Sequence, residues 1–326
     1  MHAWLCESLD GIAAMPWREL PTPEPQPGEV RIVVRCASLN FPDLLIVEGK
    51  YQFKPALPFV PGAEFSGTVD ALGEGVKHLQ LGQAVAALGS HGGFGTHACV
   101  SARNVLPLPA GMPFEDGAAF AFAYGTSYHA LMDRAALRAG ETVLVLGAAG
   151  GVGSAAVQIA KAAGATVIAT ASTASKADFC RRLGADHAID LSAGVPLRDA
   201  LKALTHGRGP DVVYDPVGGD LAEPAFRSIA WRGRYLVVGF AGGSIPALPF
   251  NLSLLKGASV VGVFWGEFVR REPQAFAKDM AQLAAWYAQG LVKPAIDSLL
   301  PMSALPDAYA RMASRQVMGK VVMHNG

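Results

Sequence analysis

The chain has 326 residues, enough for two domains, and its 51 % hydrophobic and 17 % charged residues argue against disorder. Lysine plus arginine and aspartate plus glutamate both number 27, so the zero net charge gives no reason to expect nucleic acid or an anionic membrane as a partner. The four cysteines form no C-x-x-C pair, and neither a secretory signal nor a membrane-spanning apolar run is visible, so we expect a cytoplasmic protein with free thiols.

The first third of the chain is rich in proline and glycine and contains short β-like runs. Residues 30–35, 65–69 and 83–88 are typical of strands. Turn signals separate them, such as Pro27-Gly28 and Gly73-Glu74-Gly75. The pattern predicts a compact, strongly bent β domain.

From about residue 116 the pattern changes to alternating helices and strands. Residues 117–134 have near-helical apolar spacing, and the strands are expected at 142–146, 166–170, 187–190, 212–215, 234–238 and 260–264. Such alternation predicts an α/β fold with a doubly wound parallel sheet. A helix at 274–289 and a strand at 320–323 follow, and this tail is more like the first third. We therefore expect a nucleotide-binding domain at 122–266, inserted into a discontinuous β-rich domain formed by 1–121 and 267–326.

A glycine turn, Gly147-Ala148-Ala149-Gly150-Gly151-Val152-Gly153, joins a buried strand to an alanine-rich helix. This order places a dinucleotide pyrophosphate on a helix N-terminus. The motif reads A-x-G-x-x-G, with Ala148 where the first glycine usually stands. Gly150 would let the phosphates approach the backbone, and Gly153 would let helix and strand pack closely. An ordinary tight turn is the alternative, but the flanking strand and helix favour the nucleotide.

The next strand, at 166–170, indicates which dinucleotide is bound. A carboxylate about 20 residues past the glycines would hold a ribose 2′-hydroxyl, but Ala171-Ser172 occupies that place. Lys176 follows and supplies a charge that could compensate a 2′-phosphate. The sequence therefore predicts NADPH over NADH. Alternatively, Lys176 is a solvated residue at the start of a helix.

Several motifs together resemble the zinc-free quinone oxidoreductases of the medium-chain dehydrogenase/reductase superfamily, the group that includes zeta-crystallin. The resemblance covers nearly the whole chain. The matching segments are Asn40-Phe41-Pro42-Asp43, Gly49-Lys50-Tyr51, Pro61-Gly62-Ala63-Glu64-Phe65-Ser66-Gly67, Gly125-Thr126, the glycine turn, Tyr214-Asp215-Pro216-Val217-Gly218-Gly219, and Gly233-Arg234-Tyr235-Leu236-Val237-Val238-Gly239-Phe240. They are specific for the superfamily and less so for the substrate.

The resemblance implies a Rossmann domain inserted in a GroES-like catalytic domain, with the nicotinamide in the cleft between them. It places the following residues around the cofactor: Thr126, the helix start at Gly150, Gly151 and Val152, the phosphate residues Ser172, Lys176 and Arg315, and the carboxamide neighbours Gly239, Phe240, Phe264 and Trp265. Leu191 stands where relatives often have a phosphate-binding tyrosine, which weakens the NADPH prediction. Phe240 and Trp265 would suit a flat acceptor, or else belong to the core.

The resemblance also bears on metal. Zinc-dependent relatives have a cysteine near Asn40 and a histidine just before the equivalent of Glu64, and here Asn40 and Ala63 stand there. A catalytic zinc needs three converging ligands and an open position. Only Cys99 lies where the relatives cluster four cysteines, and His91 and His97 are more typical of surface residues. We expect no metal.

Three residues are candidates for the chemistry, by the same resemblance. Asn40 can donate and accept hydrogen bonds, and could order a substrate carbonyl or a water molecule. Tyr51 could donate to the oxygen that gains charge as hydride arrives, or it could be a packing aromatic. Asp43 could take part, or could cap the helix that follows.

We predict a zinc-independent quinone oxidoreductase that transfers hydride from NADPH to a quinone or another electron-poor acceptor. A 2-enoyl thioester or enone reductase would share the fold and the cofactor. A third possibility, of another class, is a non-catalytic NADPH-binding structural or redox-sensing protein. The apolar strand at 259–264 would lie at a sheet edge, and exposed apolar edges tend to be paired, so we expect a homodimer.

Overall fold

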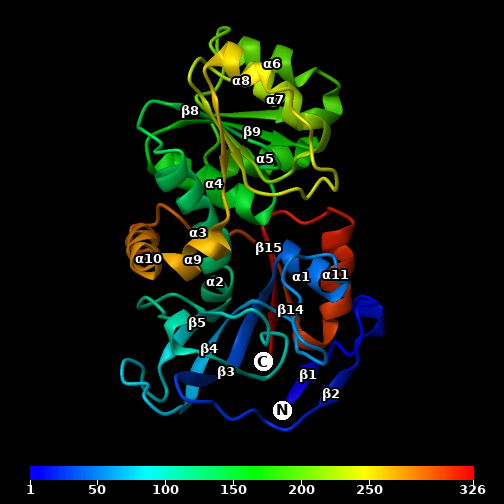
Figure 1. Cartoon of the computed structure of the whole chain (residues 1–326), viewed down its shortest axis with the longest axis vertical. Coiled ribbons are helices and arrows are strands. Elements are labelled where there is room, and N and C mark those ends of the chain that lie inside the picture. Colours follow the sequence, from blue (N-terminus) through cyan, green and yellow to red (C-terminus); the bar gives the residue numbers. More distant parts are fainter. The chain divides into compact units, whose positions relative to one another are not determined.

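The computed structural model describes residues 1–326 and divides into two units. Unit 1 comprises Met1–Phe122 and Pro294–Gly326, and unit 2 comprises Ala123–Lys293. Both ends of the chain therefore build unit 1, and the blue and red segments of Figure 1 belong to it. No helix of the chain combines the length and the apolarity needed to cross a membrane.

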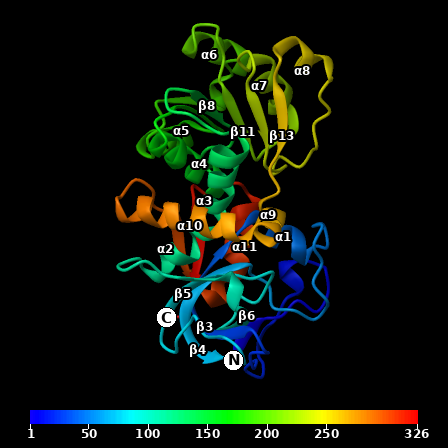
Figure 2. The same cartoon turned by 60° about the vertical axis from the view of Figure 1, so that its left-hand side comes forward.

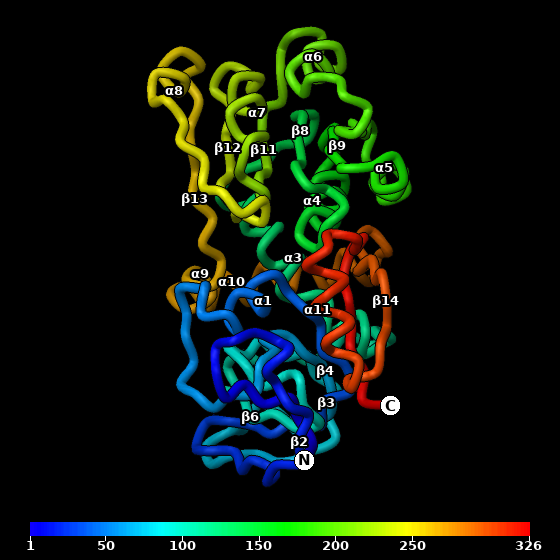
Figure 3. The backbone as a smooth tube through the Cα atoms, turned by 90° about the vertical axis from the view of Figure 1, so that its right-hand side faces the viewer, coloured from blue at the N-terminus to red at the C-terminus, as the bar shows by residue number.

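Unit 2 is built on a six-stranded parallel sheet. Its strands are β8 (Thr142–Val145), β9 (Thr166–Ala171), β10 (His187–Asp190), β11 (Val212–Asp215), β12 (Arg234–Val237) and β13 (Ser259–Gly262). Their order is β10-β9-β8-β11-β12-β13, and Figure 3 shows β13 to β9 side by side in this sequence. The order reverses between β8 and β11, which is the switch point where doubly wound sheets bind ligands. The sheet thus confirms the predicted α/β fold.

Helices cover this sheet and explain its apolar strands. Those that contact its strands are α4 (Gly151–Ala162), α5 (Ala174–Arg182), α6 (Leu197–Leu204) and α7 (Ala222–Ser228). Unit 2 also contains α8 (Asn251–Lys256), α9 (Trp265–Arg271) and α10 (Pro273–Ala288). Helix α4 contacts β8 and β9, and α7 contacts β11. Val143, Leu144 and Val145 of β8 are fully buried, as expected for a strand that is covered on both faces.

Unit 1 contains the β-rich part of the chain. Its strands are β1 (His2–Trp4), β2 (Trp17–Glu19), β3 (Glu29–Leu39), β4 (Glu64–Leu72), β5 (Ala84–Leu88), β6 (His97–Ser101), β7 (Val105–Pro107), β14 (Ile296–Pro301) and β15 (Lys320–His324). The main sheet has the order β14-β15-β3-β4-β5-β7, and β6 pairs with β3. Figure 2 shows β3, β4, β5 and β6 together in this unit. Because β15 pairs with β3, the last strand of the chain joins the first long one.

Unit 1 also contains short helices. They are α1 (Phe41–Val47), α2 (Phe114–Ala118) and α11 (Leu305–Ala313), and α3 (Ala121–Tyr128) starts in unit 1 and continues in unit 2. Side chains of β3, β4, β6, α1 and α11 form one hydrophobic cluster. The side chain of Tyr309 in α11 is buried in it, and its hydroxyl donates to the carbonyl oxygen of Asp43 at 3.4 Å.

The boundary between the units differs from the expected one for residues 267–293, which we assigned to the β-rich domain. In the structure they belong to unit 2, because their aromatic side chains pack there. Phe268 stacks on His129, Phe276 packs against Trp265, and Trp286 packs against Tyr128. Such apolar contacts could not be read from the composition of the segment.

The helix expected at 117–134 is divided into three pieces. They are α2, α3 and a π-helical segment at His129–Arg134. Helix α3 starts afresh because the N–H of Phe122 in its first turn donates to Oε1 of Glu64 at 2.8 Å. The first N–H groups of a helix have no partner within the helix, and here a buried carboxylate from β4 supplies one.

The expected strands at 187–190 and 212–215 are confirmed with these bounds. The strand expected at 260–264 is shorter at its end: β13 stops at Gly262, and Phe264 precedes the first turn of α9. Strands β1, β2, β6, β7 and β14 have no counterpart among the expected elements. They are short or lie in segments rich in proline and glycine, where apolar periodicity is weak.

Candidate active site

The glycine turn lies between β8 and α4 and has the geometry of a phosphate-binding loop. Gly147 adopts a left-handed backbone (φ +57°), and Gly150 is the N-cap residue of α4. A Cβ on Gly153 would lie 2.3 Å from the carbonyl oxygen of Gly147, so only glycine fits this close approach. Ala148 needs no positive φ and is buried, and therefore an alanine is tolerated at the first position of the motif.

Gly150 has a different environment from that of Gly153. A Cβ there would meet only the carbonyl oxygen of Gly147, at 3.5 Å, which is an ordinary contact. Its φ of −79° and ψ of 174° are accessible to any residue. The protein itself therefore does not require glycine at 150. An open backbone at the N-terminus of a helix is the arrangement that binds the phosphates of a nucleotide.

Two polar residues, Ser172 and Lys176, follow the carboxyl end of β9. Ser172 is exposed, and Thr173 is the N-cap residue of α5, with its hydroxyl accepting from the N–H of Lys176 at 3.3 Å. Lys176 thus lies in the first turn of α5 and is half-buried. No carboxylate stands at the end of β9. Asp190 ends the neighbouring strand β10, but its Oδ1 accepts from the N–H and the hydroxyl of Ser192.

Residues expected near the nicotinamide lie at the carboxyl ends of β12 and β13 and in α3. Gly239 and Phe240 follow β12, and Phe240 is partly exposed. Phe264 is exposed, whereas Trp265 is only 7 % exposed and packs against Phe276. Its indole lies 2.7 Å from where a Cβ on Gly125 would stand, next to the buried Thr126. Trp265 is therefore a core residue of unit 2, which favours the packing alternative for this side chain.

A carboxylate that the sequence analysis did not single out organises the loop after β11. Oδ1 of Asp215 accepts the N–H groups of Val217 and Gly218 at 2.8 Å, and the hydroxyl of Tyr235 donates to Oδ2 at 2.5 Å. Burial, together with the charge of Asp215, raises the pKa of Tyr235. The tyrosine therefore stays protonated and donates, and the loop beside Gly239 is held in place.

In unit 1, Asn40 and Asp43 form the start of helix α1. Asn40 is the N-cap residue, and its N–H donates to Oδ2 of Asp43 at 2.8 Å. Asp43 is not the N-cap residue itself but the third helical residue, and its carboxylate caps the helix start as part of a capping box with Asn40. Burial raises the pKa of Asp43 to about 7, although the N–H groups of Asn40 and Ala63 and the charge of Lys320 act in the opposite direction. Asp43 is therefore a titratable group near neutral pH.

Glu64 and Lys320 form a buried ion pair next to Asn40, and sequence reasoning missed the role of both. Nζ of Lys320 lies 3.1 Å from Oε2 of Glu64 and 2.5 Å from Oδ1 of Asn40. Nδ2 of Asn40 and the hydroxyl of Ser38 also donate to Oε2, at 3.1 and 2.7 Å. The sequence did contain one sign of a buried charge: Lys320 directly precedes the apolar run Val321-Val322-Met323.

Tyr51 lies near this cluster, after helix α1. It is partly buried and packs against the hydrophobic core of unit 1. Burial raises the pKa of Tyr51, and the charge of Asp43 adds to the effect. The phenol is thus protonated at neutral pH and able to donate a hydrogen bond. The structure brings Asn40, Asp43 and Tyr51 into one neighbourhood of unit 1.

Arg315, expected at the adenosine phosphate, belongs to unit 1, whereas Ser172 and Lys176 belong to unit 2. It follows α11 and is exposed, with a left-handed backbone (φ +58°).

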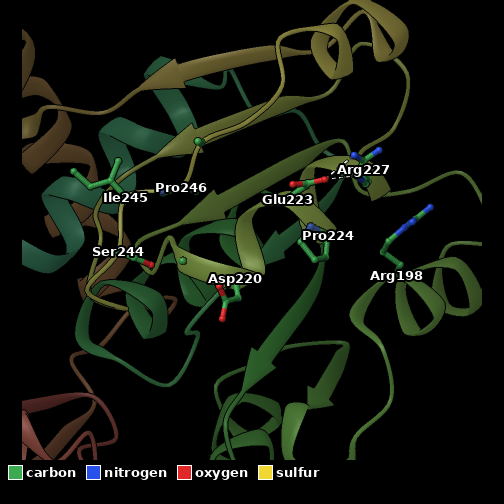
Figure 4. A pocket seen from close by; sticks show the side chains of 10 residues that line it. Arg198, Asp220, Glu223, Pro224, Arg227, Ser244, Ile245 and Pro246 are labelled. Carbon is green, nitrogen blue, oxygen red and sulfur yellow. Dashed lines mark hydrogen bonds and ion pairs between the residues drawn. The ribbon is translucent and has the colours of Figure 1, made fainter.

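A hollow of about 590 Å³ lies on the surface of unit 2 (Figure 4). It is lined by Arg198, Gly219, Asp220, Glu223, Pro224, Arg227, Ser244, Ile245, Pro246 and Ala247. Glu223 and Arg227 pair with each other at 2.6 Å, so their charges are largely compensated. None of the expected site residues lines this hollow.

The side chains around Asn40 do not fit a metal ion. No group of three or more histidine, cysteine, aspartate or glutamate side chains of the chain is placed to hold one. Glu64 already accepts four hydrogen bonds, from Ser38, Asn40, Phe122 and Lys320. Its oxygens are therefore saturated by nitrogen and hydroxyl donors, one of which carries a positive charge.

Comparisons with known proteins agree with this architecture. Residues 26–110 match the alcohol dehydrogenase GroES-like domain, and residues 151–286 match the family described as zinc-binding dehydrogenase. The chain is 36 % identical to quinone oxidoreductase-like protein 2 of Mus musculus over 298 residues, which are 91 % of this chain and 85 % of that protein. It is 32 % identical over 305 residues to the phthioceranic/hydroxyphthioceranic acid synthase of Mycobacterium tuberculosis, covering 92 % of this chain but 14 % of the synthase.

A solved structure is similar over nearly the whole chain. It is the quinone oxidoreductase of Thermus thermophilus, studied alone and in complex with NADPH, with 33 % identity and a TM-score of 0.85. The alignment covers 99 % of this chain and 100 % of that one. The glycine turn, the domain matches and the extent of these similarities lead to one conclusion: the chain belongs to the quinone oxidoreductase family of the medium-chain dehydrogenases/reductases.

Proposed function

We propose that this protein, an NADPH oxidoreductase of the medium-chain type, reduces quinones. The observation that carries the proposal is the 36 % identity to a quinone oxidoreductase-like protein over nine tenths of the chain. The open backbone at Gly150 fits a bound dinucleotide, and a Thermus relative has been crystallised with NADPH. Bound NADPH supplies a hydride, and with a proton from the protein or from water it converts a quinone to a hydroquinone.

In this proposal the residues of unit 2 bind the cofactor. The N–H groups at Gly150, Gly151 and Val152 face the pyrophosphate, and Ser172 and Lys176 hold the 2′-phosphate. Arg315 of unit 1 is proposed separately as a phosphate-binding residue. Thr126, Gly239, Phe240, Phe264 and the backbone at Trp265 bind the nicotinamide end. A lysine in the first turn of α5, with no carboxylate at the end of β9, favours a phosphate over a hydroxyl at this place.

The residues of unit 1 act on the acceptor. Asn40 and Tyr51 are hydrogen-bond donors that stabilise the oxygen on which negative charge develops. The phenol of Tyr51 is protonated at neutral pH, and it can deliver the proton to an oxygen that becomes more basic as hydride arrives. Asp43 holds the helix start that positions Asn40. We propose that no metal takes part, because the carboxylate nearest to Asn40 is already saturated by donors.

An enoyl thioester or enone reductase is the second candidate. The observation in its favour is the similarity to a segment of the phthioceranic/hydroxyphthioceranic acid synthase. A non-catalytic NADPH-binding protein is the third possibility, and the same assay decides among all of them.

The first test follows NADPH oxidation with 1,4-benzoquinone, 9,10-phenanthrenequinone, an alkyl vinyl ketone and crotonyl-CoA, with NADH in parallel. Quinone turnover with a preference for NADPH is the expected result. Turnover with the enone or thioester alone would instead assign an enoyl reductase. If NADPH binds but none of the four compounds is reduced, the chain is a binding protein.

The cofactor preference is tested with Lys176→Ala. The Michaelis constant for NADPH should rise at least tenfold while that for NADH stays within twofold, because NADH has no 2′-phosphate. Lys202→Ala, at an exposed lysine of α6, is the matched control and should change neither value. Equal effects of Lys176→Ala on both cofactors would remove Lys176 from the 2′-phosphate site.

We further propose a homodimer formed through the strand at 259–264. Strand β13 ends the sheet of unit 2, and Val260 in it is 52 % exposed. Phe250, Leu254 and Leu255 nearby in the sequence are exposed as well, which makes this edge apolar. An unpaired apolar edge favours pairing with the same edge of a second copy.

We propose a cytoplasmic location, which rests on the sequence analysis alone.

A further inference from the structure

The side-chain amide of Asn40 has an oxygen and a nitrogen, and the neighbouring charges of Lys320 and Glu64 determine which of the two faces each charge. Nζ of Lys320 contacts Oδ1 of Asn40 at 2.5 Å, and Nδ2 of Asn40 donates to Oε2 of Glu64 at 3.1 Å. An ammonium group can only donate hydrogen bonds, and an ionised carboxylate can only accept them. The opposite orientation of the amide would set its N–H groups against the ammonium and its oxygen against the carboxylate. The ion pair therefore excludes the flipped amide.

This cluster is shielded from solvent, which makes its charges effective. Glu64 and Ser38 are fully buried, and Lys320 is 4 % exposed. Each carboxylate oxygen of Glu64 has a partner: the hydroxyl of Ser38 and two nitrogens at Oε2, and the N–H of Phe122 at Oε1. In such a low-dielectric environment, a misdirected amide is strongly unfavourable.

We propose that Lys320 is a positioning residue for the reduction reaction: with Glu64 it orients the Asn40 amide so that Asn40 presents an N–H, and not its oxygen, to the acceptor. One N–H of Nδ2 is directed at Glu64, and the other remains available. A donor aimed at the acceptor oxygen stabilises the negative charge that develops when hydride arrives, whereas an oxygen there would repel it. The inference rests on the proposed function, in which Asn40 contacts the acceptor.

Backbone geometry places Lys320 in this position. Gly319 before it has a φ of +94°, and a Cβ there would lie 2.0 Å from the carbonyl oxygen of Ala295. The N–H of Lys320 donates to the same carbonyl at 2.8 Å. The start of β15 therefore lies close to Ala295, just before β14. The side chain of Lys320 lies next to Asn40 and Glu64.

The test is a double-mutant cycle between Asn40 and Lys320 in the full chain, with NADPH and the best acceptor. Lys320→Met should lower kcat by 10- to 100-fold while the Kd for NADPH stays within twofold. Asn40→Ala should lower kcat similarly, and Asn40→Ala with Lys320→Met should be no slower than Asn40→Ala alone, because Lys320 acts through Asn40. Asn40→Asp keeps the size and the acceptor for Lys320 but has no N–H, so it should lose as much activity as Asn40→Ala.

Two further variants separate this role from a merely structural one. Lys161→Met breaks the half-exposed Lys161–Asp186 ion pair of unit 2 and should leave kcat unchanged. Lys320→Met combined with Glu64→Gln removes both charges beside Asn40 and therefore permits either orientation of the amide. It should lower kcat even if Lys320→Met does not fold. Additive losses in the cycle, or a kcat within twofold of the wild type for Lys320→Met or for Lys320→Met with Glu64→Gln, would overturn the proposal.

A second readout needs no turnover and therefore separates this inference from the proposed function. In the wild type, the side-chain amide proton of Asn40 that is bonded to Glu64 should exchange with solvent more slowly than its partner on the same nitrogen. The pair is identified by NMR from its disappearance in Asn40→Asp. Lys320→Met with Glu64→Gln should bring the two exchange rates closer together. Two equally fast protons in the wild type would refute the fixed amide, whether or not any quinone is reduced.

Discussion

Two glycines of one turn, Gly150 and Gly153, differ in what a methyl group would meet, and this difference gives opposite predictions for the same substitution. In Gly153→Ala the new Cβ would lie 2.3 Å from the carbonyl oxygen of Gly147 and 2.8 Å from Cα of Ala148. Both neighbours are backbone atoms, so helix α4 must move relative to β8. Overpacking of this kind costs about 1–3 kcal/mol.

For a domain of the size of unit 2, a loss of about 3 kcal/mol lowers the melting temperature by about 6–12 °C. Gly150→Ala should fold normally, because its Cβ meets only one atom, at 3.5 Å. A gain of about 0.4–1 kcal/mol from the stiffer unfolded chain offsets the poorer N-cap. Its defect should be in binding, with the Kd for NADPH raised at least tenfold by the methyl group that faces the phosphates.

The two variants are compared by thermal unfolding without cofactor and by fluorescence titration with NADPH. The expected results are a clear loss of stability for Gly153→Ala, and a loss of affinity at unchanged stability for Gly150→Ala. Wild-type stability of Gly153→Ala would refute the close approach of α4 to the turn. Wild-type affinity of Gly150→Ala would refute the assignment of this open backbone to the pyrophosphate.

Three other predictions concern Asp43, Gly125 and Val260. The pKa of Asp43 is about 7 in the folded state and near 4 when unfolded, so its contribution to the free energy of unfolding is lost as pH rises from about 4 to 7. In urea unfolding between pH 5 and 7, Asp43→Asn should therefore lose about 2 kcal/mol less stability than the wild type. Parallel plots of unfolding free energy against pH for the two proteins would contradict this. Gly125→Ala should destabilise the protein by about 1–3 kcal/mol, because the new Cβ would lie 2.7 Å from the Trp265 indole. Adding Trp265→Phe should restore part of the melting temperature, and if it restores none, the strain does not arise at this contact. In sedimentation velocity Val260→Lys should be a monomer, whereas the control Val195→Lys, at a residue that is equally exposed, should remain a dimer. A monomeric wild type would refute the edge-strand dimer.

Local pattern was sufficient for most of unit 2. Strands β10 and β11 follow the predicted ranges because short apolar runs bounded by turn residues are informative when helices alternate with them. The role of Gly153 was also predictable, since the motif already encodes a close passage of helix and strand. The motif was misleading at its first position: Gly147 adopts the left-handed turn, so Ala148 is no defect.

Side-chain partners far apart in sequence were not predictable. Asn40, Asp43 and Tyr51 belong to one short segment, and a motif could identify them together. Glu64 and Lys320 lie 256 residues apart and meet only because β15 pairs with β3 and β3 pairs with β4. Their partnership depends on strand register, which one sequence does not specify.

The sequence by itself determined the fold class, the glycine turn and the absence of an acid after β9, because these depend on residue type and local spacing. Tertiary structure alone decided three things: that Trp265 is a core residue, that residues 267–293 belong to unit 2, and that a buried carboxylate divides the helix expected at 117–134. The physical reason is common to all three. Burial and hydrogen bonding of a side chain depend on which distant elements pack against it, and such packing leaves little trace in the local pattern of apolar residues.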